Sequence, residues 1–253
     1  MPPIHDLIAD LDALLEPSAY RDYGPNGLQV PGCADVTRVA TGVTAHRELI
    51  ERAIDADAQL LLVHHGLFWH FHPTGLTPAL AARLRLLFRH DLNLAAYHLP
   101  LDGHESVGNN ALLAEGLGCA RHEPFGEPRG RPIGRLGRFD SEGIDAETLF
   151  ARVRELTGRE PLVFDAGPSR VRSIGIVSGG AAKSLPDAVA LGLDAFLTGE
   201  PAENVMGDAR EAGVHFIAAG HHATETFGIR ALGDRLAARF GIDHLFIDVP
   251  NPI

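Results

Sequence analysis

The chain has 253 residues, of which 45% are hydrophobic and 22% charged, a composition typical of a globular protein with one large domain or two smaller ones. Its net charge of −11 disfavours binding to nucleic acid or to an anionic membrane surface. The first residues form an acidic amphipathic pattern rather than a signal peptide, and no apolar run is long enough to span a membrane. Cys33 and Cys119 are far apart and lack a CxxC spacing, so we expect a cytoplasmic protein without a disulfide framework or a thiolate zinc site.

Apolar strand-like runs alternate with helix-like segments through the first half of the chain. Pro78 marks the start of one expected helix and Gly118 the end of another, in agreement with the usual places of these residues. Pro100 is expected to halt the third strand. The expected strands are 38–45, 59–65 and 93–102, and the expected helices are 46–56, 77–90 and 109–118.

A proline- and glycine-rich segment at 123–134 predicts a linker or an extended crossover between two lobes, 1–125 and 126–253. A second alternating series follows it. Its expected strands lie near 171–178, 194–198, 214–219 and 244–249, and its expected helices at 145–158, 182–191, 201–212 and 223–240. Such alternation predicts an α/β fold with mostly parallel, helix-covered sheets.

Histidines gather where three of the expected strands end. Open α/β sheets bind ligands beyond the carboxyl ends of their strands, so side chains at these positions are candidate ligands. The strand ends carry His64 and His65, His98 and Asp102, and His221 and His222. Glu225 lies four residues after His221, which places both on one face of a helix that begins at the preceding glycine.

Imidazoles and carboxylates without thiolates suit Zn, Fe, Mn, Ni or Co. Each residue alone has an ordinary explanation: Asp102 as a cap, Glu225 as a first-turn acid and a single histidine as a surface residue. Together at three strand ends they favour a metal site. Two carboxylates among several histidines indicate a centre with two divalent ions.

Several other features allow a functional or a structural interpretation. His104 and Glu200 are candidate pocket residues, and His70 and His72 are expected in a loop. The stretch VSGGAAKS at 177–184 resembles a phosphate loop, but Val177 and Ala182 break the required pattern, and a tight strand–helix turn is the favoured interpretation. The densest basic run, 129–138, would have to carry any contact with nucleic acid.

The motifs resemble those of the Nif-three-like family, whose members carry the name GTP cyclohydrolase I type 2 homologue. They occur in family order over almost the whole chain, in the short bacterial form. The matching motifs are NGLQVPG (26–32), VHHGLFW (63–69), YHLPLD (97–102), GNNALLAEGLG (108–118), SGGAA (178–182), TGEPAEN (198–204), AAGHHATETFGIRAL (218–232) and FIDVPNPI (246–253).

This resemblance implies two similar α/β lobes with a di-metal site in the cleft between them, and a toroidal homohexamer. The ligands carried over by motif are His64, His65, Asp102, His221 and Glu225, which are also the residues reached from the strand ends. It implies that His98 lines the pocket or acts as an occasional extra ligand. Of the neighbours His221 and His222, it makes His222 the weaker candidate for a metal ligand.

Two classes of function fit these predictions. The first is a metal-dependent hydrolase of a nucleotide-like or other small phosphorylated or heterocyclic substrate, with His98, His104 or Glu200 transferring protons. The second is a non-enzymatic metal chaperone, sensor or scaffold protein. The sequence identifies neither the substrate nor the metal.

Overall fold

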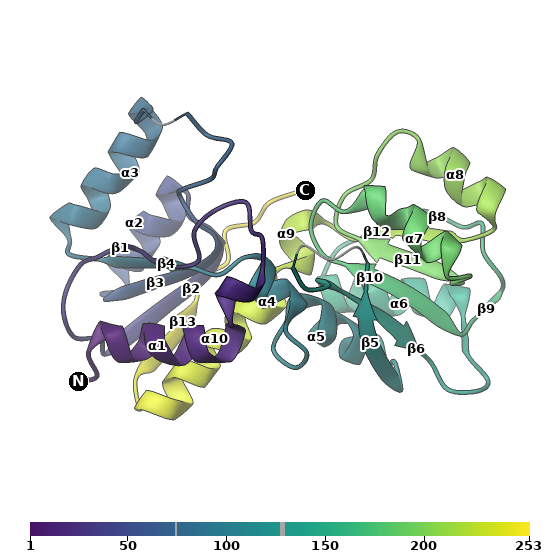
Figure 1. Cartoon of the computed structure of the whole chain (residues 1–253), viewed down its shortest axis with the longest axis horizontal. Coiled ribbons are helices and arrows are strands. Elements are labelled where there is room, and N and C mark those ends of the chain that lie inside the picture. Colours follow the sequence, from purple (N-terminus) through teal and green to yellow (C-terminus); the bar gives the residue numbers. More distant parts are fainter. Residues whose placement is uncertain (74, 127–129) are drawn as a thin grey trace. The chain divides into compact units, whose positions relative to one another are not determined.

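The computed structural model describes residues 1–73, 75–126 and 130–253. The chain divides into two compact units (Figure 1). The first contains residues 1–101 and 228–250, and the second contains 102–227 and 251–253. Within the described residues, no helix is both long and apolar enough to cross a membrane.

The first unit is built on a five-stranded sheet with the order β1-β4-β3-β2-β13. Strands β4, β3, β2 and β13 are parallel to one another, and the edge strand β1 pairs antiparallel with β4. Two helices, α4 (Leu99–Gly103) and α10 (Thr226–Phe240), carry the chain from one unit to the other. The remaining elements are α1 (Ile4–Leu15), the 3-10 turn η1 (Pro17–Ala19), β1 (Gly27–Val30), β2 (Arg38–Thr44), α2 (Arg47–Asp55), β3 (Leu60–His65), α3 (Pro78–Arg89), β4 (Asn93–Ala96) and β13 (Asp243–Phe246).

Helices cover both faces of this sheet, with α2 and α3 over one face and α1 and α10 over the other (Figure 1). The three inner strands β4, β3 and β2 are buried on both faces, which explains their continuous apolar runs. On the α2–α3 face, Leu49 and Leu87 pack with Leu61, Val63 and other strand residues in one cluster. Burying a leucine side chain contributes about 1.5–3 kcal/mol, so this cluster stabilises the strand ends that follow it.

The second unit contains a six-stranded sheet with the order β5-β6-β10-β11-β12-β8 and a small sheet of β7 and β9. Parallel strands β10, β11 and β12 form the centre, and antiparallel strands flank them. Its elements are α5 (Asn109–Gly116), β5 (Arg121–Phe125), β6 (Gly134–Arg138), β7 (Ile144–Asp145), α6 (Ala146–Thr157), β8 (Leu162–Phe164), β9 (Arg170–Val171), β10 (Ser173–Val177), η2 (Ala182–Ser184), α7 (Leu185–Ala190), β11 (Ala195–Thr198), α8 (Val205–Ala212), β12 (His215–Ala218) and α9 (His221–Thr224).

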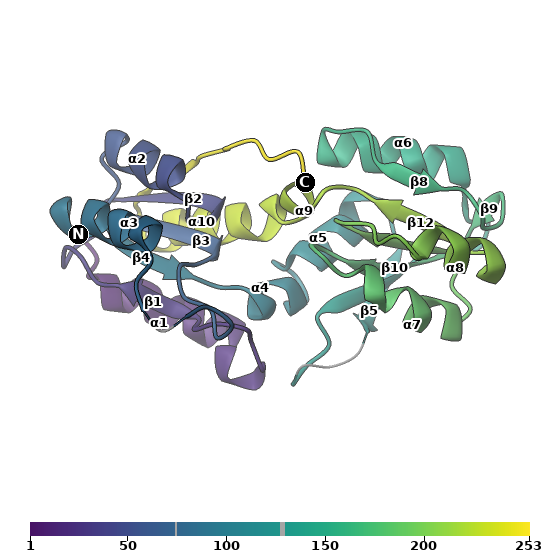
Figure 2. The same ribbon diagram turned by 90° about the horizontal axis from the view of Figure 1, so that it is seen from above.

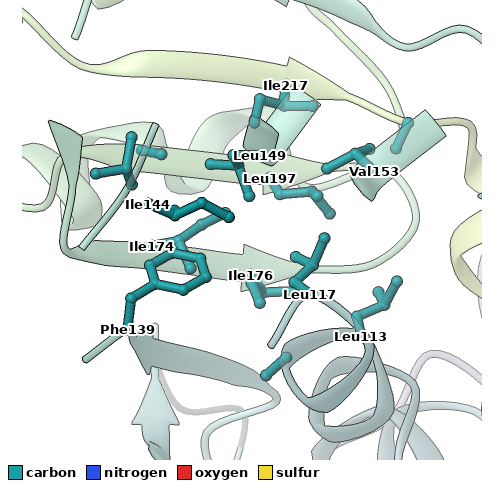
Figure 3. Packing of buried hydrophobic residues seen from close by; sticks show 14 of the residues in the cluster. Leu113, Leu117, Phe139, Ile144, Leu149, Val153, Ile174, Ile176, Leu197 and Ile217 are labelled. Atoms are coloured by element: carbon teal, nitrogen blue, oxygen red, sulfur yellow. The ribbon is translucent and has the colours of Figure 1, made fainter. Parts of the chain in front are cut away.

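In this unit α6 and α7 lie on opposite sides of the six-stranded sheet (Figure 2). The core on the α5–α6 side joins Leu113 and Leu149 of the helices to Ile174, Leu197 and Ile217 of the strands (Figure 3). These three strand residues belong to the parallel centre of the sheet, so the core fixes the strands whose ends carry the candidate site.

The α/β class is confirmed, and the structure refines four expectations from the sequence. The second sheet is mixed rather than mostly parallel: β5 pairs antiparallel with β6, β6 with β10, and β8 with β12. The expected strand 93–102 ends at Ala96, since Leu99 begins the short helix α4, with Pro100 in its first turn. The expected helix 223–240 is interrupted at Glu225, which separates α9 from α10.

The fourth difference concerns the expected linker and lobes. Residues 121–125 form β5, an edge strand of the described sheet, and edge strands tolerate a proline such as Pro124. Residues 127–129 of the expected linker lie outside the described part of the chain. The unit boundary falls after Leu101 rather than after 125. The chain also returns to the first unit for 228–250, because β13 pairs in parallel with β2.

Candidate metal centre

Three histidines meet at one edge of the first unit's sheet. His64 and His65 are the last residues of β3, and His98 lies two residues beyond β4. These two strands are parallel neighbours whose register pairs Val63 with Ala96, so their carboxyl ends lie side by side. One ring nitrogen from each histidine lies within 4.8 Å of those of the other two, a spacing that could hold a metal ion.

The Nδ1 atom of each of these histidines has an oxygen partner. His64 Nδ1 donates to the backbone carbonyl of Tyr97 at 2.9 Å, which fixes the proton on Nδ1 because a carbonyl can only accept. His98 Nδ1 bonds the carboxylate of Asp22 at 2.7 Å, and His65 Nδ1 lies 3.0 Å from the hydroxyl of Thr44. Metal-binding histidines use their second nitrogen in this way, which leaves Nε2 as the ligand atom.

Asp22 is a buried carboxylate held by several donors. Besides His98, it accepts bonds from the Asn26 amide at 2.9 Å, from Leu99 N–H at 2.9 Å and from Tyr23 N–H at 2.6 Å. Burial raises the pKa of Asp22, but the bonds and charge from His98, with those from Asn26 and Tyr23, lower it below its ordinary value overall. The carboxylate therefore stays ionised and orients the His98 ring.

The second unit contributes two buried carboxylates. Asp102 in α4 is 4% exposed, and Glu225, between α9 and α10, is 2% exposed. An oxygen of one lies within 4.8 Å of an oxygen of the other. Like charges buried this close disfavour each other strongly, and a cation or shared protons must offset that cost. Paired buried carboxylates beside imidazoles are therefore a suitable donor set for divalent metal ions.

His221 lies between two carboxylates of the same unit. Its Nδ1 bonds the carboxylate of Glu200, and its Nε2 lies 3.2 Å from Oε1 of Glu225. Burial lowers the pKa of His221, but hydrogen bonds and charges from Glu225 and Glu200 outweigh this and raise it to about 9. A divalent cation at Nε2 would take the place of the proton that these carboxylates stabilise.

Polar side chains of the second unit hold Asp102. Its Oδ1 accepts from Asn109 Nδ2 at 2.8 Å and from the Ser178 hydroxyl at 2.9 Å. Ser178 is itself fixed, since its backbone N–H donates to Asn110 Oδ1 at 2.7 Å. Both bonds to Asp102 go to one oxygen, which orients the carboxylate in the manner typical of a metal ligand.

The glycine turn after β10 passes directly beside this group. Gly179 has a φ of +67°, and a Cβ atom there would lie 2.4 Å from Glu225 Oε1 and 3.1 Å from His221 Nε2. The turn continues into η2 and a six-residue helix, α7. The glycine is thus explained by its close approach to Glu225, in line with a tight strand–helix turn rather than a phosphate loop.

The other sequence candidates have different surroundings. His104 Nδ1 accepts the backbone N–H groups of Ser106 and Val107 at 3.2 Å each, so this ring caps the turn before α5. The backbone N–H of His222 donates to the carbonyl of Ile253 at 2.9 Å. His70 and His72 are exposed in the segment after β3. Arg129, the first residue of the basic run, lies outside the described residues.

Sequence reasoning missed the residues that orient the candidate ligands. These include Asp22, which is 76 positions away from His98, and Ser178, which is 76 positions away from Asp102. Thr44 ends β2, so its position beside β3 would have been a usable signal once the strand order was known. No pattern within the sequence pairs Asp22 with His98 or Ser178 with Asp102.

The fold and these residues define a class of two-unit α/β proteins with histidine and carboxylate groups that could bind metal ions. Within that class, the chain belongs to the family Duf34/NIF3 (NGG1p interacting factor 3), whose model matches residues 2–252.

Similar proteins cover nearly the whole chain. Relatives from Pseudomonas aeruginosa and Vibrio cholerae, both named GTP cyclohydrolase 1 type 2 homolog, are 46% and 43% identical, over 97% and 98% of each chain. Among solved structures, the protein TTHA1606 from Thermus thermophilus is 38% identical with a TM-score of 0.91, and the match covers 100% of both chains. These likenesses support the same fold for the whole chain.

Proposed function

We propose that this protein binds two divalent metal ions and is a metal-dependent hydrolase of a nucleotide-like or other small phosphorylated or heterocyclic substrate. The observation that carries the proposal is the pair of buried carboxylates, Asp102 and Glu225, with oxygens within 4.8 Å of each other. We assign the ligand positions to these two residues and to His64, His65 and His221. Zn, Fe, Mn, Ni and Co all suit this donor set.

The course of the chain relates candidate ligands of the second unit to the points where the chain passes between the units. Asp102 is the first residue of the second unit and shares the short helix α4 with the last residues of the first. Glu225 lies three residues before Gly228, where the chain returns to the first unit through α10. Asp102 and Glu225 thus lie close in sequence to the two points where the chain passes between the units. His98 directly precedes α4, the short helix that contains Asp102.

When bound, the ions would supply an acidified water and electrostatic stabilisation of the charge that develops during hydrolysis. The protein's own residues would handle the protons. His98, oriented at Nδ1 by the ionised Asp22, is placed to accept a proton at Nε2 and return it to a leaving group. Glu200 would hold His221 through Nδ1 rather than act on the substrate.

The substrate class draws support from the names of the relatives. Those proteins carry the name GTP cyclohydrolase 1 type 2 homolog, which contains the name of a nucleotide and so favours a nucleotide-like substrate.

The test combines metal content with turnover. Wild-type protein, His65→Ala, Glu225→Gln and the exposed-residue control His90→Ala would be purified, loaded with each candidate metal and screened against nucleotides, phosphoesters and cyclic amides. We expect hydrolysis by wild type and His90→Ala, and loss of both metal and turnover in the other two. Normal metal content without turnover on any substrate would refute the hydrolase and favour a chaperone, sensor or scaffold.

A toroidal homohexamer and a cytoplasmic location remain predictions from the sequence. Light scattering coupled to size-exclusion chromatography would measure the mass of the assembly. A mass of one or two chains would contradict the hexamer.

A further inference from the structure

An aromatic pair follows the histidines of β3. Trp69 and Phe71 stack with a centroid distance of 5.7 Å and an interplanar angle of 20°. Phe71 is 69% exposed, and the ring of His72 meets it edge-on at 4.9 Å. Beside Trp69, the exposed ring of Phe71 presents an aromatic surface that a ligand ring can cover.

The pair adjoins the histidine cluster of the first unit. Trp69 meets His98 edge-on at a centroid distance of 5.1 Å, and its centroid is 5.9 Å from that of His65. A ring stacked on Trp69 would therefore lie beside a residue that itself contacts two imidazoles, since stacked aromatic centroids are about 4.5–7 Å apart.

Backbone contacts hold the segment in place. His70 N–H donates to the Tyr23 carbonyl at 2.7 Å, and Leu67 N–H donates to Gln29 Oε1 at 2.8 Å. Gly24 lies so close to the segment that a Cβ atom there would be 2.3 Å from the Phe68 carbonyl oxygen and 3.3 Å from the Trp69 ring. The aromatic pair is thus preorganised, which reduces the entropy lost when a ligand binds.

We infer that the aromatic pair is a stacking platform for a planar heterocyclic ring of the substrate. The inference rests on the proposed function and narrows its substrate class from small phosphorylated or heterocyclic compounds to those that contain a planar ring, as nucleotides do. Stacking on an aromatic side chain tolerates any base, because every base has a π-face. The platform would hold the ring next to Trp69, which contacts His65 and His98.

The experiment measures binding of guanosine 5′-monophosphate and of ribose 5-phosphate, which lacks the ring, by calorimetry in metal-loaded and metal-free protein. Trp69 is the sole tryptophan of the chain, so quenching of intrinsic fluorescence reports on this segment directly. The variants are Phe71→Leu, which keeps an apolar side chain without a ring, Phe71→Tyr, which keeps the ring, and Phe88→Ala, a matched control at a phenylalanine that is 58% exposed in α3.

We expect the nucleotide to bind and quench Trp69 in wild type, Phe71→Tyr and Phe88→Ala. Ribose 5-phosphate should bind at least tenfold more weakly, and Phe71→Leu should weaken nucleotide binding by about five- to a hundredfold. Metal content should be the same in all four proteins.

Equal affinities for the two ligands, or for wild type and Phe71→Leu, would overturn the inference while leaving the metal proposal intact. A smaller assembly in Phe71→Leu with unchanged nucleotide affinity would also overturn it and identify the pair as a contact between copies. If nucleotide binding depends on Phe71 but the protein takes up no metal, the proposed function is refuted and the stacking platform stands.

Discussion

Replacing Gly179 with alanine should remove metal from the protein while leaving it folded. The added Cβ would lie 2.4 Å from Oε1 of Glu225, whereas a Cβ atom essentially never lies under 3.0 Å from another heavy atom of this kind. Because that oxygen ends a flexible side chain, the carboxylate can move away at little cost to folding. It then no longer holds its position beside Nε2 of His221.

The cost to stability comes from the backbone. Gly179 has a φ of +67°, and an alanine in the left-handed region costs about 1–2 kcal/mol. In a chain of this size such a loss lowers Tm by roughly 2–8 °C. Displacing a ligand should weaken metal binding at least as much as losing a residue that orients one, which costs about 10–100-fold in affinity.

Gly192 provides a matched control. It has a similar φ of +63°, but a Cβ atom there would meet nothing within 4 Å. Gly192→Ala therefore carries the same backbone strain without touching Glu225. The measurements are Tm by calorimetry for both metal-free variants and metal affinity by competition with a chromophoric chelator.

We expect similar decreases in Tm for the two variants and a loss of metal affinity in Gly179→Ala only. Wild-type affinity in Gly179→Ala would show that Glu225 is not held in place by the glycine turn or does not bind metal. Equal losses of affinity in both variants would assign the effect to backbone strain and refute the argument from close approach.

Three further predictions follow from the same contacts. Adding Ni²⁺ or Co²⁺ to metal-free protein should quench the fluorescence of Trp69, whose ring adjoins two histidines; unchanged emission after metal uptake would place the ion elsewhere. Ser178→Ala removes a donor to Asp102 and should weaken metal binding by about 10–100-fold, whereas the exposed control Ser106→Ala should not. In metal-free protein the pKa of His221 is raised from 6.5 to about 9, so its contribution to stability is complete below pH 6.5 and is lost as the pH rises towards 9. Urea unfolding across this range should show that loss in wild type but not in His221→Gln, and equal losses in both would refute the assignment.

Much of the fold could be predicted because local patterns encode it. The run QLLLVHH placed β3 within one residue, since a buried parallel strand must be apolar on both faces. The same run put His64 and His65 at a strand end, where α/β proteins bind ligands. Pro78 and Gly118 likewise marked helix ends through constraints on their own backbone.

The second sheet shows where local patterns fail. Strand β5 contains Pro124 and β8 has only three residues, so neither carries a strong local strand pattern. Their antiparallel pairing depends on the neighbouring strands β6 and β12. The return of β13 to the first sheet is likewise a matter of pairing with β2, more than two hundred positions earlier. Nothing in its four residues specifies that partner.

The sequence by itself determined the kinds of candidate ligand and their places at strand ends, because strand length, apolar burial and residue chemistry act over a few neighbouring positions. Only the tertiary structure decided how those ligands are held: Asp22 orients His98, Glu200 orients His221, and Gly179 leaves room for Glu225. Hydrogen bonds and close contacts of this kind join residues far apart in the chain. They exist only after the sheets have set strand order and register, and that is the physical reason why the sequence predicts a metal site but not its supporting structure.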